Sequence, residues 1–157
     1  MTTKQPFFTV IIVAFNSGDY LDECINALEE QIFKDFEIII FDNGTKDGSA
    51  HSIDSSRLNI NIIKSTSNKG FAVGNNAAAK DAKGGWLVLL NSDAIPEKDW
   101  LLEIFKAVCR YPDIVIFGST QINYHHPNVL DGAGDHYHIF GAAWRGAKGY
   151  PVDSIPE

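Results

Sequence analysis

One stretch of the sequence, residues 86–94, constrains the fold more than any other. Five apolar residues in a row, Trp86 to Leu90, end abruptly in the polar triplet Asn91-Ser92-Asp93. A short apolar run between turn signals predicts a strand buried on both faces, as in a parallel sheet with helices on either side. The triplet then lies beyond the carboxyl end of the strand, where open α/β sheets bind their ligands. The alternative is that these residues merely cap a helix that begins near Glu97.

Similar apolar runs recur along the chain, each followed by a segment with helical periodicity or helix-favouring residues. Besides the strand from Trp86, we expect strands at 7–15, 36–41, 58–64 and 114–117, and helices at 19–32, 50–56, 77–82 and 97–110, with a polar bend at 67–76. This alternation predicts right-handed crossovers and an α/β fold, with a mostly parallel, Rossmann-like sheet and helices on both faces. We expect an α/β domain over residues 1–120 and an irregular tail over 121–157, with short strands around Ile122 and Tyr137.

Composition argues against two classes of partner. The chain has 157 residues, 45% of them apolar, and a formal net charge of -7 with a pI of about 5.1. This acidic balance counts against nucleic acid and anionic membrane surfaces as partners. Cys24 and Cys109 are far apart on predicted apolar helix faces, so we expect free, buried thiols. The expected location is cytoplasmic, and this is compatible with peripheral association at the inner face of the membrane.

Polar clusters follow three of the predicted strands at equivalent positions. These clusters are Phe15-Asn16, Asp42-Asn43 and Asn91-Ser92-Asp93. In a parallel sheet all three lie at the carboxyl edge, which predicts a crevice with carboxylates for the hydroxyl and amide donors of a ligand and for a metal ion. A dinucleotide fold would need Gly-x-Gly-x-x-Gly after the first strand, where only Gly18 is present, and the segment 44–49 lacks the lysine of a P-loop.

Four segments carry a resemblance to a known family. They are 9–16 (TVIIVAFN), 36–49 (FEIIIFDNGTKDGS), 68–76 (NKGFAVGNN) and 89–93 (LLNSD). With these motifs in this order, the chain resembles the N-terminal, nucleotide-sugar-binding half of an inverting family-two glycosyltransferase with the GT-A fold. Within that family it is most similar to the rhamnosyltransferase-like members.

The resemblance implies a nucleotide-sugar site with ten members: Ala14, Phe15, Asn16, Asp42, Asn43, Lys69, Gly70, Asn75, Asn91 and Ser92. Ala14 and Phe15 would contact the nucleoside. Asp42 and Asn43 occupy the acidic pair that grips the base and ribose, with Asn in the second place. Lys69 and Gly70 would border the nucleotide.

The resemblance also implies a metal ion and a reaction. Asn91-Ser92-Asp93 replaces the family's Asp-x-Asp, which leaves Asp93 as the expected ligand of Mn²⁺ or Mg²⁺. That cation would neutralise the departing diphosphate. The implied partners are a dTDP- or UDP-linked sugar, with rhamnose as one candidate hexose, and a glycan or polysaccharide acceptor.

The resemblance implies that the general base of such a transfer is an acidic residue in an acceptor half, expected beyond Glu157. Neither Asp131 nor Asp135 matches the motif of that base. We therefore expect a truncated donor-binding half that self-associates through apolar surface after Gln121. The alternative is a non-catalytic nucleotide-sugar-binding or assembly module.

The tail contains other residues to which a function could be assigned. His125-His126 and His136-x-His138 could ligate a metal, but no cysteine or carboxylate cluster supports them, so a dedicated histidine site is disfavoured. Trp144 and Arg145 could stack on a sugar, although packing is the simpler expectation. Trp86 and Trp100 are expected in the core.

Overall fold

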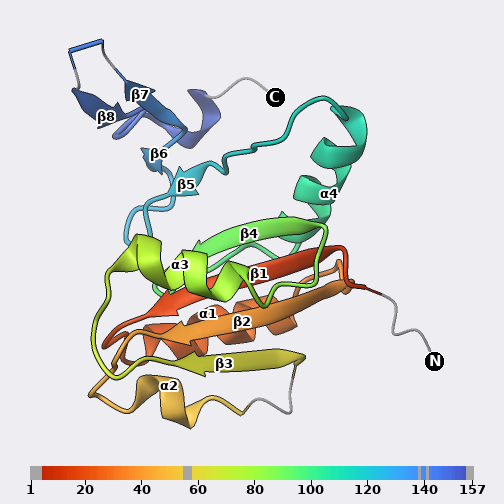
Figure 1. The fold of residues 1–157 in the computed structure, drawn as a ribbon. Coiled ribbons are helices and arrows are strands. Elements are labelled where there is room, and N and C mark those ends of the chain that lie inside the picture. Colours follow the sequence, from red (N-terminus) through yellow and green to blue (C-terminus); the bar gives the residue numbers. More distant parts are fainter. Residues whose placement is uncertain (1–4, 55–57, 138, 141, 155–157) are drawn as a thin grey trace. The chain divides into compact units, whose positions relative to one another are not determined.

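The computed structural model describes residues 5–54, 58–137, 139–140 and 142–154 (Figure 1). The chain divides into two compact units, Met1–Ala107 and Val108–Glu157. The boundary between these units lies inside the last long helix. The first unit contains the sheet, and the second contains short strands.

The first unit confirms the predicted α/β class. Its parallel sheet has the strand order β3-β2-β1-β4. The strands are β1 (Phe8–Ala14), β2 (Phe36–Asp42), β3 (Ile60–Lys64) and β4 (Trp86–Asn91). The helices are α1 (Tyr20–Glu29), α2 (Ser49–Ser52), α3 (Phe71–Ala79) and α4 (Trp100–Arg110), the last of which crosses the boundary between the units.

The register brings three strand ends level at one edge of the sheet. Ala14 at the end of β1 lies beside Asp42 of β2, and Val13 lies beside Asn91 of β4. The segments that follow these strands therefore leave the sheet as neighbours.

Helices cover both faces of the sheet, as predicted (Figure 1). On one face, Val10 and Ile12 of β1 pack in a core cluster with residues of α1 and with Leu101 of α4. On the other face, Ile11 and Val13 pack with Ala78 of α3. Trp86 and Trp100 are partly buried against the first cluster.

The expectation that β4 is buried on both faces is wrong. Leu87 and Leu89 are 47% and 55% exposed, whereas Val88 and Leu90 are buried. β4 is an edge strand, and α3 packs on β1 and β2 rather than over it. An uninterrupted apolar run is therefore compatible with an edge strand that has one open face.

Three other expectations need correction. Helix α3 begins at Phe71, inside the predicted polar bend, because Gly70 turns the chain with φ +87° and its carbonyl accepts the Gly74 N–H at 3.2 Å. The apolar run 114–117 forms no strand in the described structure, and Val115 and Ile116 in it are strongly exposed. Cys24 is buried as expected, but Cys109 is exposed.

The second unit contains more regular structure than predicted. β5 (Gln121–Ile122) pairs with β6 (Leu130–Gly132), β7 (Asp135–Tyr137) pairs with β8 (Ala143–Arg145), and a short 3₁₀ helix, η1, spans Val152–Ser154. The expected strands around Ile122 and Tyr137 are confirmed. β6 and β8 were not predicted.

The side chains of this unit pair with each other. Trp144 is about half exposed and stacks on His136, with 5.7 Å between ring centroids. Arg145 forms an ion pair with Asp131. His138 lies outside the described residues. Among the residues that the structure describes, no helix is long and apolar enough to span a membrane.

Candidate functional site

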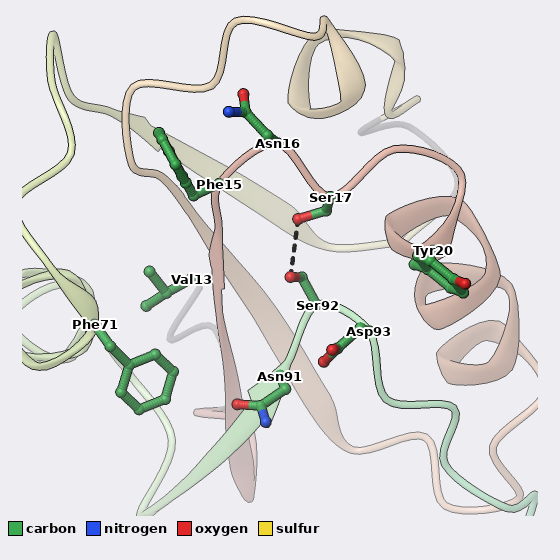
Figure 2. Close-up of a pocket in the computed structure, with 9 residues that line it drawn as sticks. All are labelled: Val13, Phe15, Asn16, Ser17, Tyr20, Phe71, Asn91, Ser92 and Asp93. Carbon is green, nitrogen blue, oxygen red and sulfur yellow. Dashed lines mark hydrogen bonds between the residues drawn. The ribbon is translucent and has the colours of Figure 1, made fainter. Parts of the chain in front are cut away.

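A cleft of about 390 Å³ opens at the carboxyl edge of the sheet in the first unit (Figure 2). Its walls come from the end of β1 and the loop after it, the first turn of α1, the start of α3 and the end of β4. The lining residues are Val13, Phe15, Asn16, Ser17, Tyr20, Phe71, Asn91, Ser92 and Asp93. The cleft therefore lies where the polar clusters predicted a ligand site.

Oxygen-bearing side chains gather at one part of this cleft. Asn91 and Asp93 are exposed, and Ser92 between them accepts a hydrogen bond from the Ser17 hydroxyl at 2.8 Å (Figure 2). That bond ties the loop after β1 to the loop after β4. This part of the cleft thus presents the carboxylate of Asp93, the amide of Asn91 and the hydroxyls of Ser17 and Ser92.

The rest of the lining is mostly aromatic. Phe15 and Phe71 are 43% and 53% exposed and flank the more deeply buried Val13. Tyr20, 50% exposed, lies on the opposite side of the cleft (Figure 2). Exposed rings beside convergent polar groups are typical of sites for small molecules that have a flat apolar part.

Five of the eleven predicted site residues line the cleft, namely Phe15, Asn16, Asn91, Ser92 and Asp93. The other six, Ala14, Asp42, Asn43, Lys69, Gly70 and Asn75, lie outside its lining. Ala14, Asp42, Asn43 and Asn75 are buried. The Asp42 carboxylate accepts the Thr45 N–H at 2.8 Å and so shapes the turn after β2.

Sequence reasoning missed Val13, Ser17, Tyr20 and Phe71. Ser17 directly follows a predicted polar cluster, so extending that cluster by one residue would have found it. Tyr20 and Phe71 each lie in the first turn of a helix that begins at the carboxyl edge. That position is a usable signal once the helix starts are known.

Asn75 has one buried atom without a partner. Its Nδ2 donates to the Phe71 carbonyl at 3.0 Å, which fixes the orientation of the amide. Its Oδ1 is buried and has no hydrogen-bond partner in the described structure. Asn75 therefore supports the backbone of the helical turn that carries Phe71.

The loop after β1 is attached to the loop after β2. Asn16 has a positive φ of 51°, which asparagine tolerates better than most residues, and its Oδ1 accepts the Lys46 N–H at 2.9 Å. The Gly18 N–H donates to Asp47 Oδ2 at 3.0 Å. Hydrogen bonds from Ser49, and then from Gly18, hold the pKa of the Asp47 carboxyl below its ordinary value of 3.8.

We expect this attachment to weaken in acid. Because the pKa of Asp47 is lower in the folded chain, ionised Asp47 contributes stability above about pH 3.8, and this contribution is lost as the pH falls through the folded value. The Gly18 amide resonance should then titrate in a ¹⁵N–¹H pH series with a midpoint below 3.8. Asp47→Asn should abolish that titration, and an unchanged curve in this variant would contradict the assignment.

A buried thiol lies behind the polar part of the cleft. Cys24 Sγ is 3.8 Å from the Asn91 carbonyl oxygen. Burial, and to a smaller extent the Asp93 carboxylate, raise the pKa of Cys24 from its ordinary value of 9.0 to about 12. The thiol is therefore protonated at neutral pH and donates to the end of β4.

The two cysteines should differ sharply in reactivity. At pH 8, the raised pKa leaves Cys24 with roughly a thousandfold less thiolate than an ordinary cysteine. We expect an aromatic disulfide reagent to label one thiol per native chain within minutes, and Cys109→Ser to remove that fast phase. Fast labelling that survives in Cys109→Ser would contradict the burial of Cys24.

Comparison with a family model settles the family. The model described as glycosyl transferase family 2 matches residues 9–138. This chain belongs to that family. Glycosyltransferase AglE of Haloferax volcanii is 28% identical over 129 residues, which make up 79% of this chain and 42% of the relative. Glycosyltransferase YfnE of Bacillus subtilis is 32% identical over 113 residues, or 70% of this chain and 29% of the relative. The family 2 chain thus spans less than half the length of these relatives.

Solved structures share the GT-A fold of this family 2 chain. Staphylococcus aureus TarS 1–349 in complex with UDP matches with a TM-score of 0.63 and 26% identity, over 67% of this chain and 32% of that one. A mannosyltransferase of Pyrobaculum calidifontis, solved with GDP-Man and Mn²⁺, matches with a TM-score of 0.62 at 24% identity and supports the fold alone. It covers 68% of this chain and 33% of that chain.

Proposed function

We propose that this family 2 chain forms the donor-binding part of a glycosyltransferase that transfers a hexose from a nucleoside-diphosphate sugar to a glycan acceptor. The observation that carries the proposal is the cleft at the carboxyl edge, where Asp93, Asn91 and a pair of serine hydroxyls face a wall of exposed aromatic rings. A nucleotide sugar combines a flat base, a polyhydroxyl sugar and a dianionic linker, and these three parts match the lining.

The donor set fits a divalent cation that is shared with the ligand. Mg²⁺ and similar hard cations prefer oxygen ligands, and they are often held by one or two carboxylates together with substrate phosphates. Asp93 supplies one carboxylate, and Asn91 supplies an amide oxygen. No group of three His, Cys, Asp or Glu residues in the described structure could hold a metal by itself. We therefore propose that Asp93 binds Mn²⁺ or Mg²⁺ together with the diphosphate of the donor.

The remaining lining residues would bind and orient the donor. Phe15 and Phe71 would pack against the base, since their rings are half exposed on the same side of the cleft (Figure 2). The hydroxyls of Ser17 and Ser92 would hydrogen-bond the ribose or the phosphates. The bound cation would stabilise charge on the leaving diphosphate. A UDP- or dTDP-sugar is the proposed donor, and the UDP complex of the similar TarS chain supports the first of these.

An inverting transfer also needs a base for the acceptor hydroxyl. In the second unit, the Asp131 carboxylate forms ion pairs with both Arg145 and Lys148. We propose that an acidic residue in another part of the whole protein takes this role. The chain covers only 29–42% of the length of its two relatives described above, which is compatible with a base that lies outside this chain.

Calorimetry tests the donor site directly. The chain would be titrated with UDP, dTDP and GDP in the presence of Mn²⁺, Mg²⁺ or EDTA. We expect UDP or dTDP to bind with a cation and at least about tenfold more weakly with EDTA, because uncompensated phosphate charge would face Asp93. Equal binding with and without metal, or no binding of any of the three nucleotides, would contradict the proposal.

A further inference from the structure

The side chain of Asn43, at the end of β2, is committed to a loop of its own chain. It is only 2% exposed. Its Oδ1 accepts the Lys69 N–H at 2.7 Å, and its Nδ2 donates to Asn68 Oδ1 at 3.0 Å and to the Gly70 carbonyl at 3.4 Å. Both amide protons and one carbonyl lone pair are therefore used within the protein.

These bonds reach the first turn of α3. The Gly70 carbonyl that accepts from Asn43 also accepts the Gly74 N–H, the first hydrogen bond of that helix. Phe71, the next residue, lines the cleft. Asn43 therefore fixes the helical turn that carries an aromatic wall of the site, although it does not line the cleft itself.

At Gly44, the residue after Asn43, the backbone lies close against the backbone of the loop 65–70. Gly44 has φ +79°, and a Cβ atom there would lie 2.8 Å from backbone atoms of Ser67. The Ser65 N–H donates to the Asp42 carbonyl at 2.8 Å. The loop 65–70 thus lies directly against the end of β2, where Asn43 can hold it.

We propose that Asn43 is a positioning residue for the nucleotide site, acting through the loop 67–70 and Phe71 rather than by contact with the base or ribose. This inference rests on the proposed function and changes the role that the acidic-pair resemblance implied. It also explains the amide at this position. A carboxylate has no N–H to donate, so it would place its oxygens against the Asn68 and Gly70 oxygens.

Two readouts test the proposal, one of them without any ligand. In the ligand-free chain, Asn43→Ala and Asn43→Asp should each speed hydrogen exchange at the Gly74 amide by about tenfold, because the α3 turn loses its support. In calorimetry with Mn²⁺, Asn43→Ala should weaken the binding of each nucleotide that the unchanged chain binds by a similar factor of about ten. The matched control is Asn59→Ala, which replaces an exposed asparagine directly before β3 and outside the cleft and should change neither readout.

Asn68→Ala keeps the proposal testable if Asn43 variants do not fold. Asn68 is exposed, and its Oδ1 also accepts the Gly70 N–H at 2.8 Å, so this variant loosens the same loop from its outer side. We expect the same increase in exchange and the same base-independent loss of affinity. The proposal would be overturned if the variants lost affinity for nucleotides of one base only while hydrogen exchange at Gly74 stayed unchanged. It would also be overturned if the variants bound nucleotides as tightly as the unchanged chain. Failure of the unchanged chain to bind any nucleotide would instead refute the proposed function, while exchange would still report on the loop.

Discussion

Asp93→Ala should lower the affinity for UDP in the presence of Mn²⁺ by about a hundredfold, because it removes the carboxylate proposed to hold the cation against the diphosphate. Asp93 is exposed, so the free energy of unfolding should change by less than about 0.5 kcal/mol. Calorimetry and urea unfolding of the same preparation separate these two effects.

The matched control for this variant is Asp81→Ala. Asp81 is an exposed aspartate that lines a separate groove with Glu37 and Lys83, outside the cleft. Its replacement removes the same charge but should leave UDP affinity within about twofold of the original. If both variants weaken binding equally, the loss is not specific to the cleft, and Asp93 has no specific role as a ligand.

Glu37→Ala should destabilise the first unit by about 2–4 kcal/mol. Glu37 is 5% exposed, and its Oε1 accepts the Thr9 hydroxyl at 2.8 Å and the Lys83 N–H at 2.7 Å. Thr9 in turn accepts the Gly84 N–H at 2.8 Å. The carboxylate therefore attaches the connection between α3 and β4 to the sheet. Its removal leaves buried donor groups without an acceptor.

Urea unfolding of Glu37→Ala and Glu37→Gln measures this contribution. Glutamine keeps an acceptor oxygen in place of Oε1, so it should recover more than half of the lost stability. A cost below about 1 kcal/mol for the alanine variant would show that the connection is held by other contacts. The affinity of both Glu37 variants for UDP, measured at urea concentrations well below their unfolding midpoints, should be little changed, since Glu37 lies outside the cleft.

The strands and their common edge could be predicted because the signals are local. Apolar β-branched runs that end in Asp, Asn or Ser identify where buried strands stop, and parallel pairing then brings those ends together. The exposed face of β4 could not be predicted in this way. Whether Leu87 and Leu89 are covered depends on which strands α3 packs against, and this is a tertiary property that an apolar run does not encode.

The site was predicted in part for the same reason. Asn91, Ser92 and Asp93 directly follow a strand, so their place at the edge was predictable. The direction of a side chain was not, because Asn43 is buried in contacts with the loop 68–70 and Asn75 is buried with its amide bonded to the Phe71 carbonyl. Phe71 was missed because the start of α3 depends on the backbone turn at Gly70, whereas the helix that begins with Tyr20 was predicted but its first turn was not taken as part of the site.

The position of a bound Mn²⁺ ion shows whether Asp93 holds the cation beside the diphosphate. The ion is paramagnetic and broadens the amide resonances of nearby residues, so a ¹⁵N–¹H spectrum with a trace of Mn²⁺ and excess UDP locates it. We expect broadening centred on Ser92, Asp93 and the adjoining Ser17, and much weaker broadening without UDP. Broadening centred on Glu37 and Asp81 in the separate groove, or none in the presence of UDP, would contradict this expectation.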